Sequence, residues 1–329
     1  MYFNVEVNGA THLWRQRFPD GVAEQITQGP SEEQGLAVTP DGKSLISSVG
    51  VRKTSVWIHD ASGEHPLSLE GSASLPKISA DFKRVYYLLR KNASSTNELW
   101  STDLASGRSN PSLAGVSMVD FDISSDGQMV AFTSGSGLQA RIFVAPLGGS
   151  APPRQVVHGG DTVSFGAPGE LIFRQLGQRV NYLARIKTDG QALERILDQT
   201  IANKLGVSPD GAWVAVVADT TLAVSVKNGT RKTICIGHCL PFWSSDGAYL
   251  YVSTKYDHTT SAGTTLVLPV PRGRGLPDLP PGGLNPAADG KLPGVREIRH
   301  GWLAPGPGPD TYAFGKSEFV GNLFQIPLH

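Results

Sequence analysis

Residues 206–219 read GVSPDGAWVAVVAD, and this stretch decides the fold because close copies of it recur along the chain. Clear copies are VTPDGKSLISSV, ISADFKRVYYLL, ISSDGQMVAFTS and WSSDGAYLYVST, and their turn aspartates together with that of the first stretch are Asp41, Asp81, Asp126, Asp210 and Asp246. A weaker copy, FGAPGELIFRQL, lies near residue 169, and a stretched copy, LAPGPGPDTYAF, carries Asp310. Most copies are about 40 to 45 residues apart, which is the length of one four-stranded propeller blade.

Each repeat continues in the same way. After the turn comes an alternating apolar strand, and further on a second alternating run such as SVWIHDASG, ELWSTDLASG or RIFVAPLGG, followed by a shorter strand. We therefore predict an all-β fold, a β-propeller of four-stranded antiparallel blades with strands a, b, c and d. The turn aspartate accepts backbone N–H bonds and the glycine supplies a positive φ. One carboxylate per turn is too few for a calcium site, so we assign these aspartates a structural role.

The two ends of the chain do not contain matching strands. Residues 1–27 read as strands b, c and d, whereas residues 302–329 read as a, b and c. Seven copies of strand a predict seven blades, and eight copies of strand c leave open an eighth, incomplete N-terminal blade. We infer that the chain starts inside a blade and is a fragment of a larger protein. The N-terminal strands either complete the last blade or form a partial blade with an open edge, and such an edge could pair with a second copy to give a homodimer.

Composition sets limits on domain organisation and partners. The 329 residues are expected to form one propeller domain, residues 1–329, with a Pro/Gly-rich insertion at 271–299. We favour a mobile surface loop for this insertion over a lid on the central channel. The chain has 29 basic and 29 acidic residues without long runs of either sign, which argues against nucleic-acid partners. It contains no signal segment and no apolar stretch long enough for membrane insertion.

Candidate site residues lie in the segments that lead from strand d into strand a, since these segments meet at one end of a propeller channel. They are Glu32, Glu33, Asp120, Asp122, Asp161, Asn203, His238 and His300. As ligands of a divalent cation (Zn, Mn or Ca) in the central channel we select Glu33, Asp120, Asp161, His238 and His300. The alternative, which we favour, is a set of solvated polar residues at a wet channel mouth. For Cys235 and Cys239, two reduced thiols are favoured over a local disulfide.

The repeats resemble the WD40-like repeats of TolB-type β-propellers over nearly the whole chain. The stretches HLWRQRFPDGVAEQIT, SVWIHDASGEHPLSLEG and NLFQIPLH resemble in particular the C-terminal propeller region of bacterial proteins whose N-terminal part is a eukaryotic-like serine/threonine kinase or a winged-helix regulator. This resemblance implies a non-catalytic recognition module of a signalling protein, with a protein, peptide or small-molecule ligand at the channel face and a periplasmic or extracellular location. No kinase motif is present in the sequence.

A second function from a different class stays open. A metal ion held at the channel mouth would allow hydrolysis of activated esters, as in phosphotriesterase-, lactonase- or arylesterase-like propellers with broad substrate range. The sequence has no GxSxG, HExxH or phosphate-binding glycine loop, so no catalytic residue is assigned and whether the chain is an enzyme stays undecided.

Overall fold

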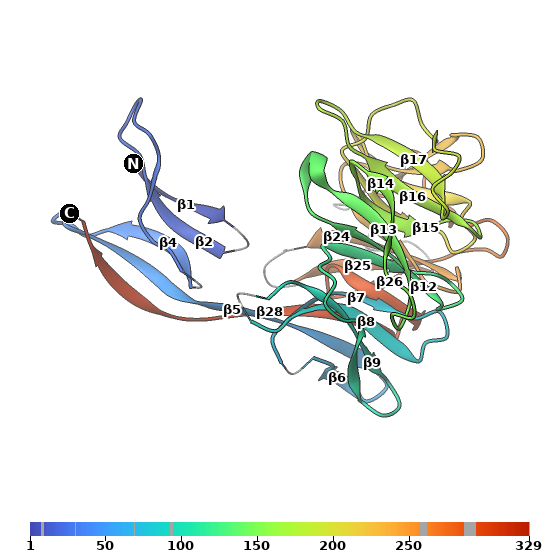
Figure 1. Cartoon of the computed structure of the whole chain (residues 1–329), viewed down its shortest axis with the longest axis horizontal. Helices are drawn as coiled ribbons and strands as arrows, with labels where there is room; N and C mark the ends of the chain where they lie inside the picture. Colours follow the sequence, from blue (N-terminus) through green and yellow to red (C-terminus); the bar gives the residue numbers. More distant parts are fainter. Residues whose placement is uncertain are drawn as a thin grey trace. The chain divides into compact units, whose positions relative to one another are not determined.

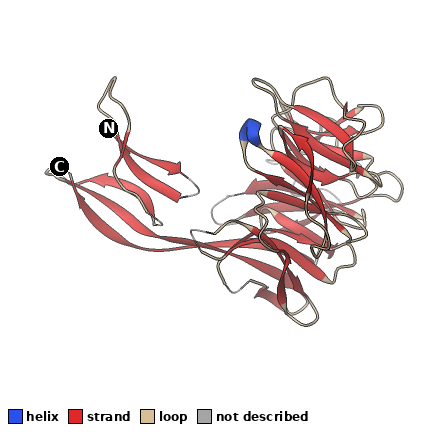
Figure 2. Cartoon of the chain, in the orientation of Figure 1, coloured by secondary structure: helices blue, strands red, loops and turns tan. Residues whose placement is uncertain are grey.

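A computed structural model describes residues 1–7, 10–29, 31–68, 70–92, 95–256, 262–285 and 294–328. Strands account for nearly all of the regular structure, and the one helix of the described residues is a single 3₁₀ turn, η1 (Gly137–Gln139), as Figure 2 shows. The described strands form seven sheets. The chain is therefore an all-β propeller, as predicted, and the number of sheets equals the number of predicted inner strands.

Contacts divide the chain into two compact units. We call Ser55–Lys316 the ring unit, and Met1–Thr54 together with Ser317–His329 the terminal unit. Two strands of 17 residues, β5 (Ser44–Asp60) and β28 (Thr311–Pro327), contribute to both units and run beside each other (Figure 1). The single domain of residues 1–329 stays a prediction, and the two units are described one after the other.

Five sheets of the ring unit contain four consecutive strands each. Their bounds are β7 (Ser72–Ile78), β8 (Arg84–Arg90), β9 (Glu98–Asp103) and β10 (Ser109–Leu113); β11 (Asp120–Ile123), β12 (Met129–Ser134), β13 (Arg141–Pro146) and β14 (Arg154–His158); β15 (Gly160–Phe165), β16 (Glu170–Gln175), β17 (Tyr182–Lys187) and β18 (Glu194–Arg195); β19 (Asn203–Val207), β20 (Trp213–Val217), β21 (Thr221–Ser225) and β22 (Arg231–Cys235); and β23 (Leu240–Trp243), β24 (Tyr249–Tyr256), β25 (Gly263–Pro269) and β26 (Arg296–Ile298).

The sixth sheet of the ring unit joins the two ends of the chain. It contains β27 (Leu303–Gly308), the first part of β28, the second part of β5 and β6 (Gly63–Pro66). Strands c and d of the first repeat therefore complete the sheet that the last repeat begins. The strands of residues 1–27 are not part of this sheet, so the first of the two closures considered from the sequence, in which they complete the last blade, was wrong.

Apolar side chains from consecutive sheets pack together around the ring. Strand β8 shows how alternation produces this: Val85, Tyr87 and Leu89 pack against the sheet of β27 and β28, while Tyr86 and Leu88 pack against the sheet of β11 and β12. Six such clusters lie between six pairs of neighbouring sheets. Because the last cluster joins the sixth sheet to the first, the ring unit is closed.

The terminal unit has a different interior. It contains the sheet of β1 (Tyr2–Val7), β2 (Ala10–Arg15) and β3 (Glu24–Gln25), and β4 (Glu32–Val38) pairs with the first part of β5. Residues 1–27 thus form their own three-stranded sheet, as the reading of strands b, c and d predicted. Among the described residues of this unit, the buried apolar side chains are only those of Leu13 and Leu45.

Separate strands b and c were predicted within residues 44–60 and within residues 311–327, and this was wrong. Each segment is one continuous strand. Gly50, where a turn could begin, does not adopt a positive φ. A Cβ atom at this position would overlap with the backbone of Val320 and Gly321. Pairing between β5 and β28 therefore keeps both strands extended.

The repeated turns have the structure that the sequence predicted. In five repeats a Ser or Thr hydroxyl two residues before the aspartate donates to the carboxylate at 2.5 to 2.6 Å, and the backbone N–H two residues after it donates to the same carboxylate at 3.0 to 3.1 Å. Gly127, Gly211 and Gly247 supply the positive φ of 67 to 71° that follows. In the second repeat Phe82 occupies this position with a φ of 58°.

The insertion at 271–299 was expected to be a mobile surface loop. Its described part instead packs onto the ring unit: Leu276 and Leu284 are buried in the cluster between the fourth and fifth sheets, and Trp243 Nε1 donates to Gly275 O at 2.8 Å. Leu284 also exchanges backbone hydrogen bonds with Ile234 and Ile236 beside β22. Apolar burial thus anchors residues 271–285, whereas residues 286–293 lie outside the described part of the chain.

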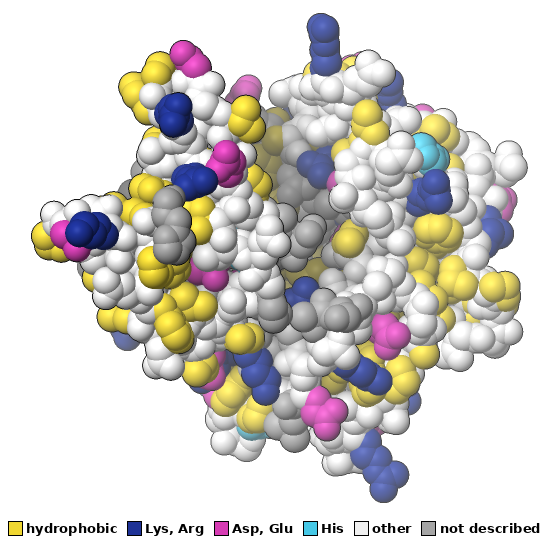
Figure 3. All heavy atoms as spheres, turned by 60° about the vertical axis from the view of Figure 1, so that its left-hand side comes forward, with side chains coloured by type: hydrophobic (Ala, Val, Ile, Leu, Met, Phe, Trp, Pro, Cys, Tyr) yellow, Lys and Arg dark blue, Asp and Glu magenta, His cyan; other side chains and the backbone are white. Residues whose placement is uncertain are grey.

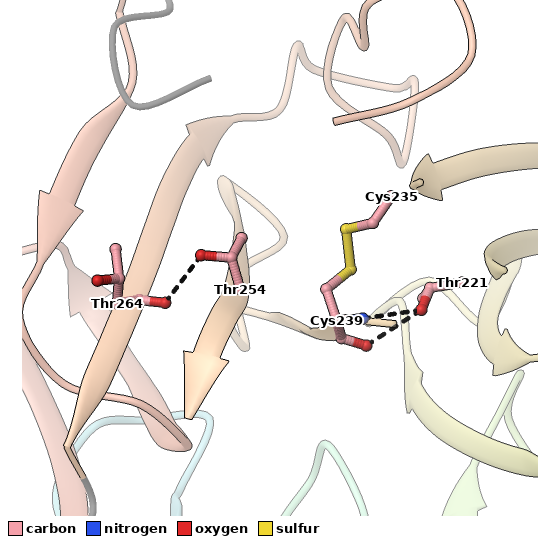
Figure 4. Close-up of a disulfide and its surroundings, with 5 residues drawn as sticks. All are labelled: Thr221, Cys235, Cys239, Thr254 and Thr264. Carbon is pink, nitrogen blue, oxygen red and sulfur yellow. Dashed lines mark hydrogen bonds between the residues drawn. A yellow bond between two sulfur atoms is a disulfide. The ribbon is translucent and has the colours of Figure 1, made fainter. Parts of the chain in front are cut away.

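The expectation of two reduced thiols was also wrong. Cys235 and Cys239 form a disulfide, and both residues are buried (Figure 4). Thr221 holds the second cysteine, because Cys239 N donates to Thr221 Oγ1 at 3.0 Å and the same hydroxyl donates to Cys239 O at 3.2 Å. The disulfide therefore ties the end of β22 to the start of β23, where one sheet continues into the next.

Candidate functional site

Irregularities in the innermost strands set the directions of their polar side chains. Each of the strands β7, β15 and β19 has a shift of register, between Ser74 and Lys77, between Asp161 and Ser164, and between Lys204 and Val207. Leu75 and Thr162 lie in the first two of these bulges with φ values of 52° and 49°, although neither is glycine. A left-handed non-glycine residue costs about 1–3 kcal/mol, and bulges are a common way to re-aim side chains.

Lys77 and Asp122 connect three neighbouring sheets. Lys77 Nζ, on β7, donates to Asp122 Oδ1, on β11, at 2.9 Å, and the other carboxylate oxygen accepts a hydrogen bond from Phe165 N, on β15, at 2.9 Å. Burial opposes the charged form of Lys77, but the carboxylates of Asp122 and Asp120 outweigh this effect and raise the pKa of the lysine. The pair is therefore an ion pair held between three strands.

Lys204, on β19, continues the series into the next sheet. Only 3% of this residue is exposed, and its ammonium group donates to Ser164 Oγ on β15. Burial lowers the pKa of Lys204 to about 8, although Asp122 and Asp120 act in the opposite direction. An ammonium group has three donors. Among the described residues Ser164 is the only acceptor that it reaches, so two donors stay available.

Arg174 and Asp161 form the third polar contact. Arg174 reaches from β16 to the carboxylate of Asp161 with two hydrogen bonds, Nε to Oδ1 at 2.8 Å and Nη2 to Oδ2 at 2.6 Å. Its third nitrogen donates to Ala202 O, just before β19. This bidentate hydrogen bonding fixes the position of the Asp161 carboxylate and occupies both of its oxygens.

Asp120 lies two residues before Asp122 on β11, so the two side chains are on the same side of the strand. Burial raises the pKa of Asp120, and Lys77 and Lys204 oppose this effect. Its carboxylate accepts from the backbone N–H of Phe121 but makes no hydrogen bond to another described side chain. We call Lys77, Asp120, Asp122, Asp161, Ser164, Arg174 and Lys204 the axial charge cluster, because it lies on and beside the innermost strands β7, β11, β15 and β19.

Three basic and three acidic groups balance in the axial charge cluster. Lys204 keeps free donors, and Asp120 keeps free acceptors. Such a pair suits a ligand group that both accepts and donates hydrogen bonds, and the low dielectric of a buried site strengthens each bond. No group of three or more His, Cys, Asp or Glu side chains with the arrangement of a metal site occurs in the described parts of the chain.

The five residues selected as metal ligands are placed as follows. Glu33 belongs to the terminal unit, where His12 Nδ1 lies 3.1 Å from its Oε2 and Thr27 Oγ1 donates to the same oxygen at 2.5 Å. Asp120 and Asp161 both belong to the axial charge cluster. His238 is exposed inside the Cys235–Cys239 loop, and His300 Nε2 lies 2.9 Å from Glu64 Oε1. Each of Glu33, Asp161 and His300 thus has a partner of its own.

The remaining candidates have local roles. Glu32 accepts from Arg52 Nε at 3.1 Å in the terminal unit, and Asn203 Oδ1 accepts from Lys204 N at 3.0 Å. Asp122 is the member of this group that the axial charge cluster uses directly. The structure therefore brings together the predicted Asp120, Asp122 and Asp161, and it does so with basic side chains.

The site residues predicted from the sequence did not include Lys77, Ser164, Arg174 and Lys204. Lys77 and Lys204 lie in the segments SLPK and ANK, which correspond to each other in two repeats and lead into strand a. A basic residue at equivalent positions of two repeats was the available signal. Arg174 could not be found in this way, because it lies on the second strand of its sheet.

No family model and no curated protein sequence matches this chain. Among solved structures it is similar to a protein assigned as TolB from Agrobacterium tumefaciens, with a TM-score of 0.57, 16% identity, and 82% of this chain and 99% of that chain covered. TolB from Acinetobacter baumannii gives a TM-score of 0.50 and 11% identity, covering 79% of this chain and 73% of that chain. A chain of a nidogen/laminin complex gives 0.50 and 13%, with 66% and 89% covered. At these identities the similarity shows the fold alone, a β-propeller.

Proposed function

We propose that this chain is a non-catalytic recognition module that binds a polar segment of a protein or peptide at the axial charge cluster. The observation that supports this is the pairing of unused hydrogen-bonding capacity: Lys204 has two free donors, and the carboxylate of Asp120 has no partner among the described side chains. A peptide amide both donates and accepts, so it complements this pair. The ion pairs of the axial charge cluster surround Lys204 and Asp120 and keep their side chains ordered before a ligand binds. Less conformational entropy is then lost on association.

A small-molecule ligand with the same donor and acceptor groups would use the same site. The metal-dependent hydrolase of activated esters is not favoured, because the predicted ligands Glu33, His238 and His300 are not part of the axial charge cluster. Within the described residues no donor set for zinc, manganese or calcium is assembled.

The test is a selection from a random peptide library on the whole protein, followed by calorimetric measurement of the dissociation constants of the selected peptides. Asp120→Asn keeps the shape of the side chain and removes its charge, and Lys204→Gln shortens the donor. We expect each change to weaken binding at least tenfold, because it removes a charge-assisted hydrogen bond.

Glu194→Gln is the matched control, because Glu194 forms an exposed ion pair with Arg185 on the outer strands of a sheet. It should leave binding unchanged. Peptides that bind all four proteins equally, or a selection that yields no binder, would overturn the proposal. Chelator-sensitive hydrolysis of chromogenic esters that depends on Asp120 would favour the enzyme instead.

The resemblance to C-terminal propeller regions suggests how binding could be used. We propose that the propeller is the sensory part of a larger signalling protein that has a kinase or winged-helix effector, and that it lies on the periplasmic or extracellular side. Figure 3 shows basic and acidic side chains interspersed on one face, and we propose that nucleic acid is not a partner. No helix of the described residues could cross a membrane.

We also propose a homodimer through an open sheet edge. In the terminal unit the residues from Ser317 to Pro327 of β28 pair with β5 on one side, and no described strand pairs with their other side. Val320, Leu323 and Phe324 are exposed on this edge. Two copies related by a two-fold axis would pair antiparallel along this edge. A mass measurement in solution over a range of concentrations tests this, and Val320→Lys should give a monomer.

A further inference from the structure

A second polar site lies in the ring unit, and none of the residues of the axial charge cluster lines it. It is a cavity of about 280 Å³ between the sheet of β7 to β10 and the sheet of β11 to β14. One wall is formed by polar side chains of β8, β9 and β10, and the other by the turn residues Gly127, Leu147 and Gly148. Its volume is near the lower end of the range typical of small-ligand sites, roughly 300 Å³.

Strand register explains why this wall is polar. Arg84 on β8 is paired with Asp103 on β9, and Asp103 N donates to Arg108 O at 3.0 Å, so these three residues form one row across the sheet. The neighbouring row contains Ser101 and its partner on β10, Asn110. Further toward the ring axis, the same face of the sheet is apolar and packs against β11 and β12. The polar rows thus lie where the apolar contact between the two sheets ends.

The charges of the first row do not cancel. Asp103 Oδ1 accepts hydrogen bonds from Ser106 N at 2.9 Å and from Ser106 Oγ at 2.8 Å. These bonds lower the pKa of Asp103 and direct its carboxylate toward the 104–107 turn. Arg84 and Arg108 make no side-chain hydrogen bond or ion pair within the described chain. Two guanidinium groups therefore stand at the cavity with their donors free and only one carboxylate between them.

Hydroxyl groups complete the wall. Ser112 Oγ donates to Ser101 Oγ at 2.9 Å, which leaves the Ser101 hydroxyl hydrogen free to point into the cavity. Asn110 adds an amide that can donate and accept. Gly148 N is already used, because it donates to Ser112 O at 3.0 Å. The cavity thus has two guanidinium groups at one end and neutral polar groups beside them.

We infer that this cavity binds a small phosphomonoester of a polyol or sugar. The planar guanidinium groups of Arg84 and Arg108 match the oxygens of a phosphate group, each with two parallel hydrogen bonds. The hydroxyls of the ligand would lie against Ser101 and Asn110. The volume of about 280 Å³ equals that of about nine water molecules at about 30 Å³ each, so the phosphate and the adjoining part of a sugar fit inside the cavity and the rest of the sugar extends into solvent.

The test is calorimetric titration of the whole protein with glucose 6-phosphate, with inorganic phosphate and glucose as separate probes. We expect glucose 6-phosphate to bind, inorganic phosphate to bind more weakly, and glucose to bind at least tenfold more weakly than its phosphate. Arg84→Gln and Arg108→Gln should each weaken binding of glucose 6-phosphate by roughly tenfold, because each removes a charge-assisted contact.

Arg141→Gln is the matched control. Arg141 is exposed at the start of β13 and does not line the cavity. Its loss should leave the affinity unchanged, and all three variants should keep the unfolding temperature of the ligand-free protein. The inference is overturned if no binding occurs at millimolar ligand, if glucose binds as well as its phosphate, or if Arg141→Gln weakens binding as much as the cavity variants. If gluconate binds as tightly as glucose 6-phosphate, the site recognises a carboxylate and the assignment of a phosphate is wrong.

Discussion

At the residue scale, glycine in the repeated turns has two separable roles. Gly211 and Gly247 occupy the same position of their repeats, with φ values of 69° and 71°. A side chain on Gly247 would meet nothing closer than 3.9 Å, whereas one on Gly211 would lie 2.4 Å from Ala167 N and 2.7 Å from Gly166 C. Gly247 is therefore needed only for its left-handed backbone. Gly211 is needed for the same backbone conformation and also because a side chain there would overlap with the turn of the preceding repeat.

We therefore predict that Gly247→Ala lowers the free energy of unfolding by about 1–2 kcal/mol, the cost of a left-handed alanine. Gly211→Ala should cost more than this, because a backbone contact below 3 Å forces the two turns apart. Chemical denaturation of both variants measures the difference. Equal losses would show that the turn of residues 166–167 can move at little cost.

Lys204 supplies a second prediction at this scale. With its pKa lowered to about 8 in the folded chain and near 10.4 when unfolded, the unfolded state binds more protons between these two values. The free energy of unfolding must therefore rise with pH from about 8 to 10.5, by at most about 3 kcal/mol from this group. Chemical denaturation at a series of pH values should show that the free energy of unfolding rises more over this range in the wild type than in Lys204→Gln.

The titration can also be followed directly. In the NMR spectrum of protein with ¹³C-labelled lysine, the Cε signal that Lys204→Gln removes should titrate with a midpoint near pH 8. The signal of Lys77 should not move in that range, because its carboxylate neighbours raise its pKa. A midpoint above pH 10 for Lys204 would contradict the buried position described here.

At the element scale, the aspartate turns link stability to pH. The hydroxyl of Ser124 is the largest influence on Asp126 and lowers its pKa, and corresponding hydroxyls lower the pKa of Asp41 and Asp81. A carboxyl whose pKa is lower in the folded chain stabilises it above the unfolded value, near 3.9, and this contribution is lost as the pH falls through the folded pKa.

Asp126→Asn keeps the acceptor oxygen of the turn and removes its charge. We predict that the unfolding free energy of this variant falls less steeply than that of wild type between pH 5 and pH 2. Urea denaturation at a series of pH values measures the slopes. Identical slopes would mean that the turn carboxylate has the same pKa in the folded and unfolded chain.

Elements were predictable from the sequence where local residues determine them. The turns at Asp126 and Asp210 and the strands that flank them follow from a few neighbouring side chains. Strands β5 and β28 were divided wrongly, because their continuity depends on pairing between residues some 270 positions apart. The basic half of the axial charge cluster was missed, since the bulges that orient Lys77 and Lys204 leave no mark in the alternation of apolar residues.

At the scale of the whole molecule, the two compact units differ in what holds them together. The ring unit has six apolar clusters that close on themselves, and each large buried side chain contributes roughly 1.5–3 kcal/mol. In the described terminal unit Glu33 makes a buried contact with His12 and a partly buried one with Thr27, and only two apolar side chains are buried. Local unfolding should therefore cost more free energy in the ring unit than in the terminal unit.

Strand β28 contains both environments, so it provides an internal comparison for hydrogen exchange. Tyr312, Ala313 and Phe314 are buried in the ring unit, whereas Val320 and Leu323 are exposed in the terminal unit. We predict that amides of the first three exchange at least tenfold more slowly than those of residues 320–325, because their opening must break an apolar cluster. Hydrogen exchange with mass spectrometry at low protein concentration measures this, and repetition at high concentration shows whether a second copy protects the open edge. Uniform protection along β28 in the dilute sample would mean that the terminal unit is stabilised by more than its own few apolar contacts.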